Sequence, residues 1–132
     1  LIGLLAHSET FVQSRFKAFV YVKDNINKEL MGTYMRSFDT EGTTLRLSNW
    51  FRDYVNDPLI YQSTDSESYK DLSIPVRLIW GVEDTVTPIS LSEALLNTVP
   101  DVSLQKLEGV GHIPMIEDYD AFDMALLEAI TR

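Results

Sequence analysis

The stretch "IPVRLIWGVEDTVTP" (residues 74–88) has the pattern of a buried strand that opens into a polar loop. β-Branched, aliphatic and aromatic side chains fill residues 76–80 and Gly81 ends the run, which predicts a strand there. Two carboxylates, Glu83 and Asp84, follow directly. Because reacting groups gather at the carboxyl ends of strands in an open parallel sheet, this loop is a candidate site for chemistry.

A helix, a second strand and a last helix are expected after this loop. "SLSEALLNTVP" (residues 90–100) opens with Ser90 and carries Glu93 three residues later, which is the pattern of a capping box. The next apolar run predicts a strand over residues 102–107, and the final helix is expected over about 120–130. This alternation predicts two parallel strands joined by a right-handed crossover. The positions expected to face the core are Leu91, Ala94, Leu95 and Val99 in the first helix and Phe122, Ala125, Leu126, Ala129 and Ile130 in the last.

The sequence before the first strand has helical patterning. Apolar side chains recur at helical spacing in "KELMGTYMRSF" (residues 28–38) and "LRLSNWFRDYV" (residues 45–55). Residues 9–23 fit a helix, an irregular arm or, in "FKAFVYV", a strand. The polar stretch "STDSESYKD" is typical of a linker. The chain is therefore expected to consist of a helical segment, a linker and an α/β portion, at residues 1–62, 63–71 and 72–132.

The composition is that of a globular protein with one core. The chain has 132 residues, of which 45% are hydrophobic and 23% charged. A net charge of −9 argues against a nucleic-acid partner, because few basic groups are available to neutralise phosphates. No apolar run approaches the roughly 20 residues of a membrane span, so no membrane partner is expected. The absence of cysteine fits a cytoplasmic location, and a first residue Leu1 in place of Met fits a piece of a longer protein.

One of only two histidines stands in the loop "LEGVGHIPMIED". Gly109 and Gly111 permit backbone angles that other residues avoid, and the following proline stiffens the exit of the loop. His112 follows the second predicted strand as Asp84 follows the first, and adjacent parallel strands bring such loops side by side. An aspartate placed there can accept a hydrogen bond from one imidazole nitrogen and stabilise the imidazolium.

Together the two loops resemble the acid and histidine motifs of the α/β-hydrolases. In that family a strand followed by G-x-x-D-x-x-x-P supplies the acid of a catalytic triad. The next strand, followed by G-x-G/A/C-H and usually by a proline and an acidic residue, supplies the base. The resemblance implies the C-terminal portion of an α/β-hydrolase fold, with Asp84 as the acid, Glu83 as the neighbour most easily confused with it, and His112 as the base. The matching residues are Gly81, Asp84, Pro88, Gly109, Gly111, His112, Pro114 and Glu117.

The helical segment resembles the later part of the cap that many of these hydrolases insert before the acid strand, as in haloalkane dehalogenase-like and C–C-bond hydrolase-like members. By that resemblance Trp50, Phe51 and Tyr54 are candidates for binding the substrate. Their spacing also fits packing in a core, which is the expectation for Met31 and Met35.

The sequence departs from the family in one important respect. No position carries a G-x-S-x-G nucleophile elbow or its aspartate variant, and the HG-type loop of the oxyanion hole is also absent. The first hypothesis is therefore the C-terminal part of a hydrolase that acts on an ester, amide, epoxide, carbon–halogen or carbon–carbon bond of a small molecule. It would need no cofactor and be inactive alone. The alternative is a non-catalytic, truncated hydrolase fold that serves as an interaction or assembly module.

Two further expectations concern partners and metals. The strand over residues 76–80 would pair with residues 102–107 on one side only, and an open apolar edge favours association. We therefore expect either a homodimer through this edge or an N-terminal segment, such as "FKAFVYV", folded back to cover it. The two histidines, His7 and His112, are far apart, so no metal site is expected and His7 is interpreted as an ordinary residue.

Overall fold

The structure is a computed structural model that describes residues 8–38, 40–57 and 66–131. It contains two compact units, which are described separately. The first comprises Leu1–Lys17 and Ile26–Asp65, and the second comprises Ala18–Asn25 and Ser66–Arg132. His7 and the first part of the expected linker lie outside the described residues, whereas Ser66–Asp71 forms a 3₁₀ helix, η4.

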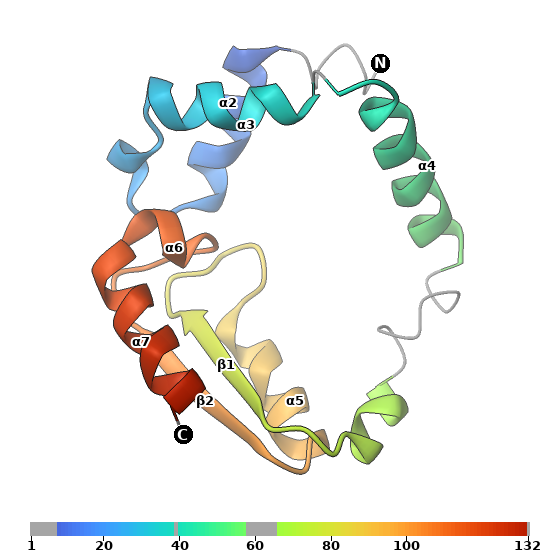
Figure 1. Cartoon of the computed structure of the whole chain (residues 1–132), viewed down its shortest axis with the longest axis vertical. Coiled ribbons are helices and arrows are strands. Elements are labelled where there is room, and N and C mark those ends of the chain that lie inside the picture. Colours follow the sequence, from blue (N-terminus) through green and yellow to red (C-terminus); the bar gives the residue numbers. More distant parts are fainter. Residues whose placement is uncertain (1–7, 39, 58–65, 132) are drawn as a thin grey trace. The chain divides into compact units, whose positions relative to one another are not determined.

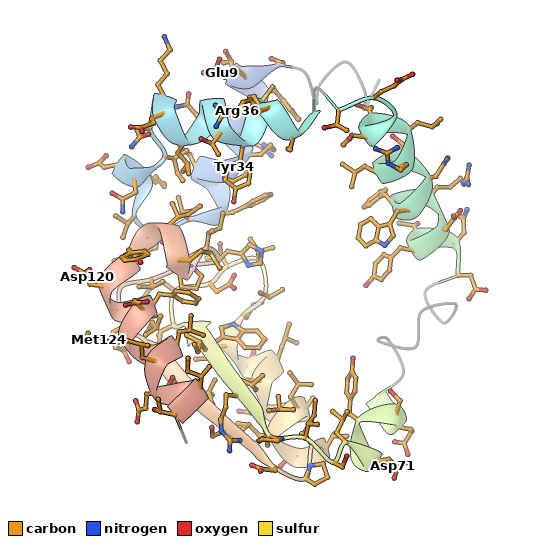
Figure 2. All side chains as sticks on the ribbon, viewed as in Figure 1. Glu9, Tyr34, Arg36, Asp71, Asp120 and Met124 are labelled. Atoms are coloured by element: carbon orange, nitrogen blue, oxygen red, sulfur yellow. The ribbon has the colours of Figure 1, made fainter. Side chains whose placement is uncertain are left out.

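The first unit is helical, as the apolar periodicity predicts. Helix α2 spans Glu9–Phe19, α3 spans Lys28–Phe38 and α4 spans Thr43–Asn56 (Figure 1). The region that the sequence left open is thus a helix as far as Phe19 and not a strand. The side chains of Val12, Ile26 and Met31 are buried, and Met31 is fully enclosed, as expected for a core residue. The ring of Tyr34, labelled in Figure 2, meets Phe16 edge-on with ring centroids 4.4 Å apart.

Helix α4 carries the predicted aromatic face, but none of its residues is buried. Trp50, Phe51 and Tyr54 are 50%, 53% and 42% exposed, and the rings of Trp50 and Tyr54 stack with centroids 5.7 Å apart. The prediction that this face packs in a core is therefore wrong for the described residues. A large exposed apolar surface is unusual in a globular unit and is typical of a binding face.

The second unit contains two parallel strands, as the sequence predicts. Strand β1 (Val76–Gly81) pairs with β2 (Val102–Leu107), in a register that runs from Val76 opposite Val102 to Gly81 opposite Leu107. Two helical turns, η5 (Ile89–Leu91) and α5 (Ser92–Thr98), connect the strands. Helices α6 (Pro114–Glu117) and α7 (Tyr119–Thr131) follow them, and α5 and α7 lie on opposite sides of the strand pair (Figure 1). The fold is therefore mixed α/β.

The predicted capping box at Ser90 is wrong. Residues 89–91 form a 3₁₀ turn closed by the Leu91 N–H on the Pro88 carbonyl at 2.9 Å, so α5 begins at Ser92, one residue later than an N-cap at Ser90 requires. Neither Ser90 nor Glu93 then stands at the position a capping box requires, and no side chain caps α5. The hydroxyl of Ser92 instead donates to the Ile89 carbonyl at 2.7 Å.

The core of the second unit is small and lies between α7 and the strands. Leu107, Val110 and Ala125 are buried in it, with Ile79, Ala121 and Phe122 packed against them. Two positions predicted to face inward, Leu126 and Ile130, are 39% and 70% exposed, because two strands offer too narrow a surface to cover the whole apolar stripe of α7. Met124 lies on the outer side of α7 (Figure 2). Among the described residues, no helix has both the length and the apolar character that crossing a bilayer demands.

Candidate active site

Asp84 lies in the loop that leaves β1, and its carboxylate is wrapped by its own loop. Oδ1 accepts hydrogen bonds from the backbone N–H groups of Val86 at 2.8 Å and Thr87 at 2.9 Å. The Thr87 hydroxyl donates to Oδ2 at 2.7 Å. The Trp80 indole N–H holds this loop in turn, because it donates to the Thr87 carbonyl at 2.8 Å. One oxygen is therefore satisfied locally, and the other keeps capacity for a second donor.

That second donor is His112. Its Nδ1 lies 2.9 Å from Asp84 Oδ2, and the aspartate side chain is only 5% exposed whereas the imidazole is 34% exposed. An ionised carboxylate can only accept, so Nδ1 carries the hydrogen and Nε2 keeps a lone pair. The pair therefore holds the imidazole in the tautomer that a general base requires.

The environment of Asp84 keeps its carboxylate charged. Burial opposes the charged form and by itself raises the pKa of Asp84. The hydrogen bonds from His112, Thr87 and Val86 act the other way, and together they bring the pKa below its ordinary value. Asp84 is thus ionised at neutral pH and can stabilise a protonated imidazole.

Glu83, the alternative acid, has a different role. Its Oε2 accepts from the Val110 N–H at 3.0 Å, and its own N–H donates to the Val110 carbonyl at 3.0 Å. These two bonds join the loop after β1 to the loop after β2. The structure therefore separates the two neighbouring carboxylates: Asp84 faces the imidazole and Glu83 fastens the backbone beside it.

Two glycines make this close approach possible. A Cβ at Gly81 would lie 2.2 Å from the Gly111 carbonyl oxygen and 2.4 Å from that of Val110, distances that no side chain tolerates. Gly109 has φ +72°, in the left-handed region that favours glycine. The predicted histidine loop thus returns over the end of β1 because both strands end in glycine-containing turns.

A cavity of about 270 Å³ opens beside the pair. Its volume is close to the lower end of small-molecule sites, and its walls are mostly apolar with a few polar groups. Among the described residues, no group of three or more His, Asp or Glu side chains could hold a metal ion. The residues that line the cavity are Ile79, Trp80, Gly81, Asp84, Thr87, Gly111, His112, Pro114, Met115 and Phe122.

The structure brings together Asp84 and His112 within one unit. Trp50, Phe51 and Tyr54 belong to the other unit, so their part in substrate binding stays a prediction. Sequence reasoning missed Thr87, although a hydroxyl three residues after an aspartate is a recognisable signal for a side-chain turn.

Thr87→Val removes one hydrogen bond to Asp84 and keeps the side-chain shape. We expect the pKa of Asp84 to rise, because the ionised carboxylate loses a donor while its burial is unchanged. Carboxyl ¹³C chemical shifts followed against pH measure this directly. Thr85→Val, an exposed change in the same loop, is the matched control and should leave the Asp84 titration in place. An unshifted titration in Thr87→Val would show that the hydroxyl does not stabilise the charge.

Asp84→Asn tests the contribution of the carboxylate to stability. Because the folded pKa is lowered, this contribution is fully present above the unfolded pKa of about 3.9 and is lost as the pH falls through the folded pKa. We expect Asp84→Asn to lower the free energy of unfolding at pH 7 by roughly 1–3 kcal/mol. It should also make the loss of stability below pH 4 shallower. Urea unfolding across this pH range measures both effects, and an unchanged acid limb would contradict the assignment.

Sequence comparison identifies a relative of this chain. It is 28% identical over 94 residues to the uncharacterized hydrolase YugF of Bacillus subtilis strain 168, a match that covers 71% of this chain and 32% of that protein. No family model matches the chain. The chain thus spans about a third of the length of this curated relative.

Comparison with solved structures shows the fold. The meta-cleavage product hydrolase CumD of Pseudomonas fluorescens IP01 superposes with a TM-score of 0.75 at 24% identity, over 94% of this chain and 46% of that chain. The 2-hydroxy-6-oxo-6-phenylhexa-2,4-dienoate hydrolase of Rhodococcus sp. strain RHA1 gives 0.67 at 21% identity, over 96% and 45%. These are α/β-hydrolase folds. The predicted fold, the C-terminal portion of an α/β-hydrolase, is confirmed.

Proposed function

We propose that this chain supplies the acid and the base of an α/β-hydrolase superfamily enzyme. The observation that carries the proposal is the hydrogen bond of 2.9 Å between a buried Asp84 and the half-exposed His112, at the carboxyl ends of two parallel strands and beside a cavity. The similarity to hydrolases in sequence and fold supports it. The proposed substrate is a small molecule, and Trp50, Phe51 and Tyr54 are proposed to bind its apolar part.

In this mechanism His112 moves a proton and Asp84 stays ionised. The lone pair on Nε2 takes the proton of a nucleophilic hydroxyl, or of a water, as its oxygen attacks the electrophilic carbon of the substrate. The imidazolium that forms is stabilised by Asp84 through the Nδ1–H bond. As the bond between the carbon and the leaving group breaks, His112 returns the proton to that group, whereas a halide leaves as the anion. Where the nucleophile is a hydroxyl, a water then attacks the covalent intermediate while His112 again takes and returns a proton, so the hydroxyl is restored and the net reaction is a hydrolysis. The classes of substrate that fit are esters, amides, epoxides, carbon–halogen compounds and compounds with an activated carbon–carbon bond.

The nucleophile of this reaction is not among the motifs of the 132 residues. The sequence has no G-x-S-x-G or aspartate elbow and no HG-type oxyanion loop. We propose that both come from polypeptide outside this sequence and that the chain by itself is inactive. The absence of cysteine supports a cytoplasmic location for the enzyme.

The purified chain should therefore show no turnover of p-nitrophenyl esters, epoxides or haloalkanes above the buffer rate. Loss of the nucleophile and the oxyanion donors together removes most of the acceleration of a triad enzyme. Absorbance of released p-nitrophenol measures ester turnover, while released halide and diol formation measure turnover of the haloalkanes and epoxides, with His112→Ala as the matched control. Turnover that disappears in His112→Ala would overturn the proposal of inactivity and require a nucleophile within these residues. Whether a parent enzyme supplies the nucleophile can be tested by searching any coding sequence upstream of Leu1 for a G-x-S-x-G or aspartate nucleophile elbow.

A second candidate function, a non-catalytic interaction module, is favoured by the open edge of β1. Among the described residues β1 pairs only with β2, so no described part of "FKAFVYV" forms a strand on its other edge. Leu127 and Ile130 on α7 add exposed apolar surface. We propose a homodimer in which two β1 edges pair, since an unprotected apolar edge is a template for a further strand.

Hydrogen exchange on β1 tests this homodimer with an internal control. The N–H groups of Val76 and Val82 bond to β2, so by the alternation of a parallel ladder those of residues 77 and 79 face the open edge. In a dimer the amides of residues 77 and 79 should exchange as slowly as those of residues 78 and 80, and light scattering should give twice the chain mass. A monomer in which residues 77 and 79 exchange at least ten times faster would contradict the proposal.

A further inference from the structure

Glu117, the last residue of α6, is almost fully enclosed, with 4% of its surface exposed. Its carboxyl group has no cationic partner among the ion pairs of the described residues. It instead accepts hydrogen bonds from four backbone N–H groups, three on Oε2 and one on Oε1. The donors are Tyr21 at 2.7 Å, Val22 at 2.9 Å and Gly111 at 3.0 Å to Oε2, and Ile113 at 3.1 Å to Oε1.

Two of these donors flank the proposed base. Gly111 and Ile113 stand directly before and after His112, so one side chain holds the backbone on both sides of the imidazole. The N–H of His112 itself donates to the Phe19 carbonyl at 3.2 Å. With Glu83 on the N–H of Val110, each of the four successive N–H groups from residue 110 to 113 has an acceptor. The loop has no regular secondary structure of its own, and these bonds fix it.

The other two donors belong to a segment that is distant in sequence. Residues 18–25 lie in the same unit as the histidine loop, and Asn25 fastens them a second time, because its Nδ2 donates to the carbonyls of Ile116 and Glu117 at 2.9 Å. The ring of Phe19 stands edge-on to the imidazole of His112, with centroids 6.1 Å apart. The segment therefore contacts His112 directly and is bound to the adjacent helix through Glu117.

The fit at this junction leaves no free space. A Cβ at Gly111 would lie 2.8 Å from the Tyr21 nitrogen and 3.1 Å from Glu117 Oε1. The glycine thus lets two N–H groups from residues about ninety positions apart reach the same oxygen. A displacement of the loop would break several of these bonds together and leave buried N–H groups unpaired, which is unfavourable.

We propose that Glu117 is a positioning residue for His112. Its carboxyl group fixes the backbone on both sides of the histidine and ties it to residues 19–22, which keeps Nδ1 within 2.9 Å of Asp84. This role rests on the proposed function of His112 as the base. A glutamine cannot replace the carboxyl group, because its –NH₂ group would face at least one backbone N–H, donor against donor.

Glu117→Gln in the whole chain, labelled with ¹⁵N at histidine and at the backbone, tests the proposal. In the unchanged chain we expect the Nδ1–H tautomer of His112 and a deshielded Nδ1–H proton resonance. In Glu117→Gln that resonance should be lost or strongly broadened, and the amides of residues 21, 22, 111 and 113 should exchange at least tenfold faster. Glu108→Gln makes the same chemical change at an exposed position of the same loop and should alter neither readout. Asp84→Ala gives the spectrum of an imidazole without its acceptor.

A role in stability alone gives a different result. If Glu117→Gln lowers the urea midpoint while His112 keeps its Nδ1–H resonance and tautomer, the positioning role is wrong. If Glu117→Gln does not fold, Asn25→Ala is the second variant. This substitution removes only the two hydrogen bonds from Asn25, which are the second attachment of residues 18–25. It should weaken the His112 signal in the same direction, and an unchanged signal would overturn the proposal. An inactive parent enzyme would contradict the proposed function but leave these spectra unaffected, so the two failures are distinguishable.

Discussion

The second unit depends on the close approach of the histidine loop to the end of β1. At Gly81 the backbone of residues 110 and 111 comes so near that a Cβ would meet carbonyl oxygens at 2.2 and 2.4 Å. This contact allows Glu83 to exchange two hydrogen bonds with Val110, and it allows the Val110 side chain to enter the core beside Leu107. His112 stands two residues after Val110, so this contact brings its imidazole to the Asp84 carboxylate at the end of β1. A larger residue at position 81 would separate the two groups.

Electrostatics at the site follow from how the buried carboxyl groups find donors. Asp84 receives bonds from its own loop and from one imidazole, so its charge is stabilised and directed at a group that takes up a proton. Among the described residues, Glu117 accepts only from backbone N–H groups, which is the basis of its proposed positioning role. Two enclosed carboxyl groups on either side of His112 thus have separate tasks, one toward the ring and one toward the main chain.

The features that could be predicted from the sequence are those set by residues close to one another along the chain. The strands, their parallel order, and the glycine turns that aim Asp84 and His112 at each other are local signals, and the structure has them. The capping box at Ser90 failed because a 3₁₀ turn after Pro88 takes up residues 89–91 and moves the start of the helix one residue further, to Ser92. The sequence predicts too many inward-facing residues on α7, because apolar periodicity does not reveal how many strands lie beneath a helix. The partners of Glu117 were missed because Tyr21 and Val22 carry no side-chain signal for a bond that their backbone makes.

The segment 18–25 shows how long-range hydrogen bonds bear on the proposed proton-transfer site. The N–H groups of Tyr21 and Val22 follow the end of α2 and donate to Glu117. A carboxylate has more lone pairs than a single carbonyl oxygen, so it can accept from several donors at once. That same group already holds both neighbours of His112. Because an unpaired backbone donor is unfavourable, the position of the chain at residues 21 and 22 and the orientation of the imidazole depend on the same carboxyl group. In the proposed mechanism the base must be placed precisely, and the main-chain hydrogen bonds to Glu117 act on that placement together with the edge-on contact between the rings of Phe19 and His112.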